Sequence, residues 1–338
     1  MEAMAPSYDK KTVLVTGGAG FIGSHVCETL TRRAHVICVD NFSTGTPAHI
    51  QALLQQPNFE LIRHDINEPL DLEAHRELDR FQIRVHGVQE IYHLASPVAK
   101  HASDRYRLAT LQTHSTGFRH ILELAVRYKA KVLLTSSSTL YEPTTETYVA
   151  EDARCWDDHL LASSVYDEAH RFSETMLQAY SDIHQFPAKI VRVFPAYGPR
   201  LRAGEGFLLP DLIRAAVAHE DLELPFSEDT RLSLCYVTDL ADGLVKAMEH
   251  PHDLHVLNLG SDQEVRLGSV VEHVLQLTGS TARIRFRAQG SVAHAPLPNI
   301  HKARQTLHWL PLVRLDEGLK RMIEYARSKH QEVGNFSL

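Results

Sequence analysis

The sequence has few of the residues that build disulfide scaffolds and structural metal sites. Its 338 residues include four cysteines, Cys27, Cys38, Cys155 and Cys235, and no two of them form a CxxC pair. This scatter predicts free thiols in a cytoplasmic protein and argues against a zinc site built on cysteine. The 22 histidines show no spacing typical of a zinc site either, so we expect no metal and place most of them at the surface.

Long hydrophobic runs and an excess of positive charge are also missing. No apolar stretch approaches the roughly 20 residues needed to cross a membrane, and residues 1–11 lack the apolar core of a signal peptide. The formal net charge is −7, which argues against nucleic acid or an anionic membrane as the partner. With 43% hydrophobic and 23% charged residues, the chain has instead the composition of a globular protein with a sizeable core.

Hydrophobic patterning predicts an α/β fold. Over the first two-thirds of the chain, short β-branched runs alternate with longer helical patterns, which indicates a doubly wound parallel sheet of the Rossmann type. The strands expected there are Thr12–Thr16, His35–Val39, Phe59–Arg63, Glu90–Leu94, Val132–Ser136 and Lys189–Phe194. The expected helices are Ile22–Arg32, Tyr106–Arg127 and Tyr166–His184, and Leu70–Val88 is expected to hold a helix and a loop.

After Phe194 the strands become shorter and prolines more frequent, which predicts a smaller C-terminal α/β lobe. We divide the chain near this point into residues 1–194 and 195–338, and the chain is free to cross between the two lobes. The strands expected in the second lobe are Leu222–Leu224, Leu234–Val237, Val256–Leu259 and Arg283–Arg287. Its expected helices are Asp211–His219, Asp239–Glu249, Leu267–Leu277 and Leu315–His330.

A glycine-rich segment, Thr16–Gly23, directly follows the first strand and opens the first helix. Gly17 permits a tight turn, Gly20 lets the backbone approach a pyrophosphate, and Gly23 allows close packing of helix and strand. The unpaired N–H groups at the start of the helix favour a phosphate. Asp40 stands at the end of the second strand, where an acid binds the adenosine ribose hydroxyls and repels a 2′-phosphate. These features predict NAD rather than NADP as the cofactor.

These residues resemble the extended short-chain dehydrogenase/reductase family, and the match spans nearly the whole chain. The GxxGxxG spacing of Gly17, Gly20 and Gly23 is that family's variant of the dinucleotide motif. Within the family, Phe59–Leu70 and Tyr166–Glu168 look most like UDP-glucuronate decarboxylases. Other segments that carry the resemblance are Asp65–Ile66, His93–Ser96, Tyr197–Arg200 and Tyr236–Asp239.

The resemblance implies an enzyme that binds NAD in residues 1–194 and a nucleotide-linked sugar mainly through residues 195–338. Tyr166 would be the base that takes a proton from the sugar, and Ser137, or its neighbours Ser136 and Ser138, would hold the reacting oxygen. Implied substrate contacts are Ser138, Arg200 and Arg231. Implied cofactor contacts are Gly17, Gly20, Phe21, Ile22, Gly23, Asp40, Asn41, Asp65, Ile66, Leu94, Ala95, Ser96, Tyr166 and His170.

Three positions depart from the family pattern near the predicted catalytic group. His170 stands where the family has the lysine of YxxxK, Thr139 where decarboxylases and dehydratases have glutamate, and His114 where the family has asparagine. Moving a tyrosine pKa from about 10 toward 7 takes roughly 4 kcal/mol, which one nearby positive charge supplies. A histidine of ordinary pKa is only partly charged at neutral pH. Either His170 is held cationic, or the nicotinamide charge does most of the work, or Tyr166 is a poor base.

These departures decide which reaction we favour. Without a glutamate at Thr139, the pattern lacks a group that elimination chemistry needs, so we favour a nucleotide-sugar epimerase that acts through a transient keto-sugar. A decarboxylase or dehydratase acting on an atypical sugar is the first alternative. A catalytically impaired NAD-binding regulatory or partner protein is the second. As in many relatives, the helices near Tyr106–Arg127 and Tyr166–His184 would pair with their copies in a homodimer. Packing on the sheet explains their apolar periodicity equally well.

Overall fold

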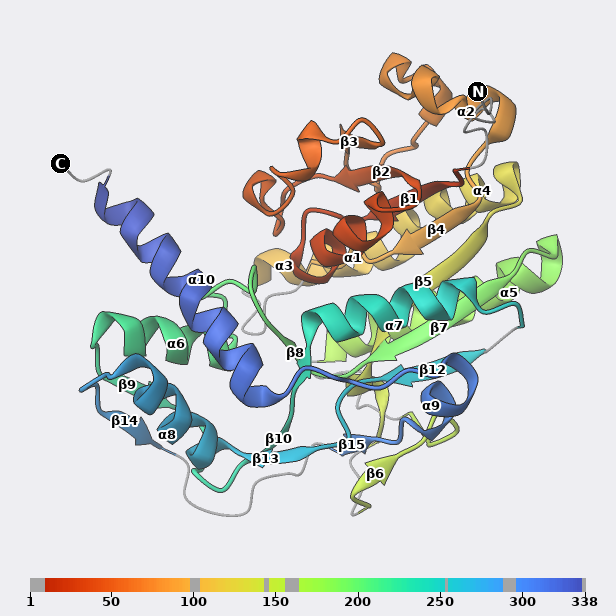
Figure 1. Cartoon of the computed structure of the whole chain (residues 1–338). Coiled ribbons are helices and arrows are strands. Elements are labelled where there is room, and N and C mark those ends of the chain that lie inside the picture. The colour runs from red at the N-terminus through yellow and green to blue at the C-terminus, as the bar shows by residue number, and fades with distance from the viewer. Residues whose placement is uncertain are drawn as a thin grey trace, which may run out of the picture.

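Seven parallel strands form the central sheet of the computed structural model, which describes residues 10–97, 104–142, 146–155, 164–252, 255–287 and 296–335 (Figure 1). The strand order is β12-β7-β5-β4-β1-β2-β3, so the sheet runs outward from β1 in two directions, as in doubly wound folds. The strands are β1 (Thr12–Thr16), β2 (His35–Asp40), β3 (Phe59–Arg63), β4 (Glu90–His93), β5 (Lys131–Ser137), β7 (Ala188–Val193) and β12 (Val256–Leu259). The predicted Rossmann-type α/β fold is confirmed.

Helices cover both faces of this sheet, which explains why its strands are apolar on both sides. Helices α1 (Phe21–Thr31) and α7 (Val237–Glu249) pack together over one face (Figure 1). Helices α4 (Phe118–Tyr128) and α5 (Val165–His184) cover the other face, and α3 (Asp104–Gln112) packs on α5.

The second lobe is built around α6 (Leu208–Ala218), α8 (Leu267–Thr278) and α10 (Leu315–Asn335). The two-stranded sheets of the structure pair β9 (Leu222–Leu224) with β14 (Ile284–Phe286), β10 (Arg231–Ser233) with β13 (Glu264–Arg266), β8 (Ala196–Tyr197) with β11 (Cys235–Tyr236), and β6 (Tyr148–Val149) with β15 (Leu297–Pro298). Because α7 and β12 follow residue 194 yet lie on and in the central sheet, the chain crosses between the lobes (Figure 1).

Two predicted elements differ in the structure: a long helix is interrupted, and a strand is shorter than predicted. The long helix expected at Tyr106–Arg127 is interrupted by a π-helical turn, η5 (Thr113–Gly117), between α3 and α4. Such turns often lie at functional sites. The strand expected at Leu234–Val237 is only Cys235–Tyr236, because Val237 already begins α7.

The Leu70–Val88 stretch forms the short helical turns η3 (Leu72–Ala74), η4 (Arg76–Phe81) and α2 (Ile83–His86). The remaining short elements are η1 (Pro47–His49), η2 (Leu53–Gln55), η6 (Ser138–Leu140) and α9 (His301–Leu307).

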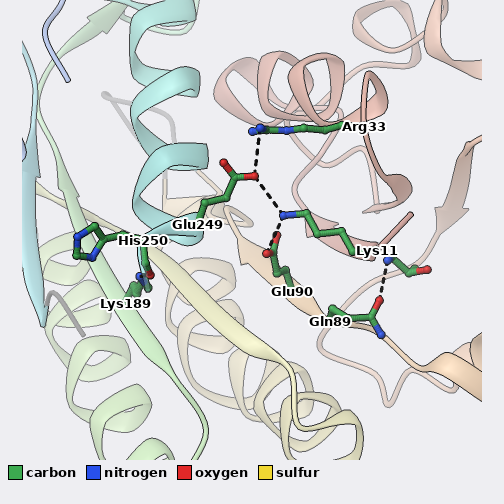
Figure 2. Close-up of polar contacts among 8 residues, drawn as sticks. Lys11, Arg33, Gln89, Glu90, Lys189, Glu249 and His250 are labelled. Atoms are coloured by element: carbon green, nitrogen blue, oxygen red, sulfur yellow. Dashed lines mark hydrogen bonds and ion pairs between the residues drawn. The ribbon is translucent and has the colours of Figure 1, made fainter. Parts of the chain in front are cut away.

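A cluster of charged residues ties the amino-terminal ends of the strands to the helices (Figure 2). The Lys11 ammonium lies between the Glu90 carboxylate at 2.8 Å and the Glu249 carboxylate at 3.3 Å, and Arg33 contacts Glu249 at 3.2 Å. The Glu90 side chain, at the start of β4, is only 6% exposed. The cluster therefore joins β4, the end of α1 and the end of α7 on the side of the sheet where the strands begin.

Within the described ranges, no helix is long and apolar enough to cross a membrane, and no group of three or more His, Cys, Asp or Glu side chains is arranged to hold a metal. The four cysteines are free thiols.

Candidate active site

A cavity of about 820 Å³ lies at the carboxyl ends of the central strands, where doubly wound folds bind their ligands. Its wall contains the glycine turn after β1, the end of β2, the segment after β4, the end of β5 and the first turn of α5. All the residues predicted to bind the cofactor, to act in catalysis or to contact the substrate line this cavity, except Arg231. The Arg231 guanidinium pairs instead with the Glu264 carboxylate at 2.7 Å, on the neighbouring strand β13.

The glycine turn after β1 leaves no room for larger residues. Gly17 has a φ of +68°, and a Cβ placed there would lie 2.8 Å from the Ala95 backbone. A Cβ on Gly23 would lie 2.1 Å from the Gly17 carbonyl oxygen. The turn therefore brings the start of α1 against the cavity, where its free N–H groups fit a pyrophosphate.

Acidic groups at the ends of β2 and β3 complete the cofactor side. The buried Asp40 carboxylate accepts hydrogen bonds from the N–H groups of Ala19 at 2.9 Å and Phe42 at 2.8 Å. Burial raises the Asp40 pKa, and these two N–H groups act in the opposite direction. Asn41 donates to the Asp65 carboxylate at 3.1 Å. This arrangement presents oxygen acceptors toward the position of an adenosine ribose, so the residues present fit NAD.

The catalytic side is built around Tyr166, in the first turn of α5, and Ser137, the last residue of β5. The half-buried Tyr166 phenol forms a hydrogen bond with the Ser137 hydroxyl. Burial raises the Tyr166 pKa to about 12, the Ser137 bond lowers it, and the Asp167 charge raises it. At neutral pH the phenol of this structure is therefore protonated.

Thr139 and Asp167 extend this contact. The Ser137 and Thr139 hydroxyl oxygens lie 2.8 Å apart, and the Thr139 hydroxyl donates to the Asp167 carboxylate. Asp167 thus places a carboxylate beside the threonine that replaces the family's glutamate. The sequence alone leaves two interpretations of Asp167, a solvated or helix-capping residue and a catalytic acid, because its position beside Tyr166 does not reveal the contact with Thr139.

His170 is neutral in this structure. Its side chain is 2% exposed and its ring lies 4.4 Å from the Tyr166 ring and 4.3 Å from the His114 ring, measured between centroids. Burial, followed by His114 and His93, lowers the His170 pKa well below its usual value. A cationic His170 is therefore excluded as the source of Tyr166 activation. Both ring nitrogens are buried and lack a partner among the described residues, and the His170 side chain lines the cavity.

His114 lies in the π-helical turn and joins three elements. Its Nδ1 and Nε2 atoms lie 2.9 Å from the hydroxyls of Ser173 and Ser96, respectively. Ser173 donates its one hydrogen to the His114 carbonyl oxygen, so Nδ1 must carry the ring proton and Nε2 accepts from Ser96. Burial lowers the His114 pKa to about 4. The ring is therefore a neutral link between α5 and the segment after β4.

Two further residues have a structural place at the site. His93 stacks on Phe118 with ring centroids 4.4 Å apart and forms a hydrogen bond to Thr16 at 2.8 Å. Arg200 lines the cavity with a φ of +72°, an uncommon backbone conformation for a residue with a side chain, and its guanidinium contacts Glu28 of α1 at 2.8 Å. The sequence drew attention to both positions, but it did not predict that His93, His114 and His170 form one buried cluster.

The fold and the site define a Rossmann-type protein with a dinucleotide turn and a tyrosine-centred cavity. Residues 13–260 match the profile of the NAD dependent epimerase/dehydratase family, and the chain belongs to this family, so its cofactor is NAD. The chain is 34% identical over 336 residues to UDP-glucuronic acid decarboxylase 1 of Xenopus tropicalis, covering 97% of this chain and 75% of the relative. It is 34% identical over 327 residues to UDP-glucuronic acid decarboxylase 6 of Arabidopsis thaliana, covering 92% and 88%.

Solved structures give the same result for the fold. A UDP-glucose 4-epimerase of Thermotoga maritima, solved with UDP-glucose, superposes with a TM-score of 0.80 at 25% identity, covering 94% of this chain and 99% of that one. A UDP-glucuronic acid 4-epimerase of Bacillus cereus, solved with NAD, gives a TM-score of 0.81 at 25% identity, covering 94% and 99%. The predicted family resemblance is confirmed.

Proposed function

We propose that this protein is an NAD-dependent nucleotide-sugar 4-epimerase, which oxidises a sugar hydroxyl to a transient ketone and reduces it again from the other face. The observation that carries this proposal is the hydrogen bond between Tyr166 and Ser137 in the cavity that also contains the dinucleotide turn. When bound, NAD supplies a reversible two-electron acceptor beside the sugar. The protein's own groups must then hold the sugar hydroxyl and move its proton.

Each catalytic side chain has a distinct part in this proposal. Tyr166 takes the proton of the sugar hydroxyl, and Ser137, which also accepts from the Thr139 N–H at 3.2 Å, fixes the position of the phenol oxygen. His170 has two unpartnered ring nitrogens, one donor and one acceptor when neutral, which suit a ribose hydroxyl of the cofactor. Arg200, Ser138 and Thr139 line the cavity and are the proposed contacts to the nucleotide and the sugar.

Decarboxylation of a nucleotide-linked uronic acid is the second candidate. Its support is the identity of 33–34% to UDP-glucuronic acid decarboxylases over most of the chain. Oxidation at C4 would produce a β-keto acid, which loses CO2 readily, so both candidates share their first step. Thr139 in place of the glutamate favours epimerisation.

Products distinguish these candidates. The purified protein with NAD is incubated with UDP-, GDP- and dTDP-linked hexoses and uronic acids, and the products are identified by mass spectrometry and NMR. An epimer has the mass of its substrate, whereas a decarboxylated product is lighter by CO2. Tyr166→Phe should abolish either reaction. If no sugar is turned over and no NADH forms, the proposal is wrong and the NAD-binding regulatory role takes its place.

A cytoplasmic homodimer is the assembly we propose. Helices α3 and α5 pack together and each exposes large apolar side chains, with Leu108 70% and Ile183 74% exposed. Pairing of these helices with their copies would cover such side chains, and the free thiols fit a reducing compartment. Light scattering should give the mass of a dimer for the wild type and of a monomer for a Leu108→Glu/Phe172→Glu variant. Cell fractionation tests the compartment.

A further inference from the structure

A continuous chain of hydroxyl groups leads away from the Tyr166 phenol. The phenol is hydrogen-bonded to Ser137, the Ser137 and Thr139 oxygens lie 2.8 Å apart, and Thr139 contacts Asp167. The chain therefore begins at the proposed base and ends at a carboxylate that also lines the cavity. No charged group interrupts it.

Counting hydrogens fixes the direction of every bond in this chain. A hydroxyl has one hydrogen to donate. Thr139 donates its hydrogen to the Asp167 carboxylate, so it can only accept from Ser137. While the phenol is protonated, Ser137 therefore gives its hydrogen to Thr139 and accepts from Tyr166. When the phenol oxygen loses its hydrogen, Ser137 turns to donate to it, and this is the bond that lowers the Tyr166 pKa. With the phenol protonated, all donors point from Tyr166 toward Asp167, which is the arrangement a proton needs to move along the chain.

We infer that this chain is a proton relay in which Asp167, acting through Thr139 and Ser137, is the final acceptor of the proton that leaves the sugar hydroxyl. The inference deepens the proposed function and rests on it. It gives a positive role to one departure from the family pattern, because Thr139 transmits the proton that Asp167 accepts.

The proton balance is complete without an added reactant. The hydrogen on the sugar carbon leaves with two electrons to NAD, as in the proposed function, and the O–H proton goes to the Tyr166 oxygen. The phenol proton moves to Ser137, the Ser137 proton to Thr139, and the Thr139 proton to Oδ1 of Asp167. Ser137 then donates back to the phenol oxygen. Reduction of the ketone runs the same steps in reverse.

Populations favour this route over a preformed phenolate. With a pKa of about 12, the Tyr166 phenol is ionised at pH 7 in only about one molecule in 10⁵. A hydroxyl chain that ends on a carboxylate lets the phenol pass its proton on while it takes up the proton of the sugar hydroxyl. The relay therefore does not depend on the small population of phenolate.

Within the part of the chain that the structure describes, no cation acts on the Tyr166 pKa. On α5, His170 faces the phenol and is neutral, and His114 and His93 from the neighbouring elements are neutral as well. Arg107 of α3 lines the cavity, and Glu168 and Arg171 of α5 pair with each other. Among the described carboxylates around Tyr166, Asp167 is the one joined to it by hydrogen bonds.

Four variants of the full-length protein test the relay. Asp167→Asn removes the acceptor and Thr139→Val removes the connecting hydroxyl, while both keep the shape of the side chain. Thr139→Ser restores the hydroxyl. Glu168→Gln is the matched control, because it neutralises the adjacent carboxylate, which pairs with Arg171 at 3.6 Å. Thermal melting and NAD binding confirm that each variant is folded.

The relay predicts a specific set of rates for a sugar that the wild type oxidises. At pH 7, Asp167→Asn and Thr139→Val should each slow NADH formation by about 100-fold, and the double variant should be no slower than either. Thr139→Ser should recover most of the rate that Thr139→Val loses, and Glu168→Gln should stay within about threefold of the wild type. The Asp167→Asn rate should rise about tenfold per pH unit above pH 7, since it now depends on phenolate, whereas the wild-type rate should level off.

The pH profile is the readout that a merely structural role would not change. If Tyr166→Phe abolishes turnover but Asp167→Asn and Thr139→Val keep the wild-type pH profile, the relay is wrong and the proposed function stands. If the wild type turns over no sugar, or Tyr166→Phe is fully active, both are wrong.

Discussion

The imidazole rings of His170 and His114 lie with their centroids 4.3 Å apart, and burial keeps both of them neutral. This contact replaces the lysine and asparagine of the family pattern by two uncharged rings. The usual source of positive charge beside the catalytic tyrosine is therefore missing at this position. Relative to the family pattern, the two replacements beside Tyr166 therefore act together, because the His170 and His114 rings contact each other.

Restoring the charge at this position should change the acidity of Tyr166. In His170→Lys, the ammonium would lie near the phenol and lower its pKa from about 12 by one to two units. NMR of ¹³C-labelled tyrosine, with the resonance assigned by Tyr166→Phe, measures this pKa directly. A His170→Gln variant of similar polarity but no charge is the control and should leave the pKa near its wild-type value.

His170→Lys should also restore part of the turnover rate that is lost when Asp167 is replaced. In the Asp167→Asn background, turnover depends on phenolate, so His170→Lys should raise the rate at pH 7 by about tenfold or more. In the wild-type background the gain should be much smaller, because Asp167 already accepts the proton. Equal gains in the two backgrounds would contradict this reasoning.

Burial of neutral His114 should make the fold sensitive to acid. The folded-state pKa of about 4 lies below the ordinary value of 6.5, so the unfolded chain binds protons first as the pH falls. The stabilisation is fully present above pH 6.5 and is lost between about pH 6.5 and 4. The expected loss is about 3 kcal/mol for this one residue. Urea unfolding at pH 8, 6 and 5 measures it, and about 2 kcal/mol of this loss should already be present at pH 5.

His114→Asn should flatten that dependence. Asparagine carries no titrating group, so the difference in unfolding free energy between pH 8 and 5 should shrink relative to the wild type. His184→Asn, at the exposed end of α5, is the control and should leave the slope unchanged. A wild-type slope in His114→Asn would show that other groups cause the acid sensitivity.

Asp40 should decide the choice of cofactor. Its carboxylate accepts from Ala19 and Phe42 and repels a 2′-phosphate, so Asp40→Asn should weaken NAD binding by about tenfold and reduce discrimination against NADP. Calorimetric titration with both cofactors measures the ratio of their affinities. Asp65→Asn, beside the adenine end of the cavity, should lower NAD affinity without changing that ratio.

The Lys11 cluster should matter for stability and not for catalysis. Lys11→Met would leave the buried Glu90 carboxylate without its cation, which costs about 3–5 kcal/mol. Arg127→Met removes an arginine that is 45% exposed and pairs with Asp71, and it should cost less than about 1 kcal/mol. Unfolding free energies measure both. Because the cluster lies at the opposite ends of the strands from the cavity, KM and kcat of both variants should stay near wild type.

The sequence by itself determined the fold, the cofactor and the position of the tyrosine. Apolar strands that alternate with helices, the Gly17–Gly23 turn and Asp40 are local patterns, and each has one physical explanation that does not depend on distant residues. The same local reasoning identified His170, Thr139 and His114 as departures from the family. It also placed the strands of the central sheet within one residue of their observed ends.

Tertiary structure decided what those departures do. The charge of His170 depends on its burial beside His114 and His93. These three histidines lie in three different elements of the fold. The place of Arg231 depends on the pairing of β10 with β13, which removes it from the cavity wall. The contact of Thr139 with Asp167 joins the end of β5 to the start of α5 across 28 residues of sequence. Desolvation and the direction of a hydrogen bond depend on which residues pack together in the folded protein. A pattern of residues along the chain therefore cannot predict them.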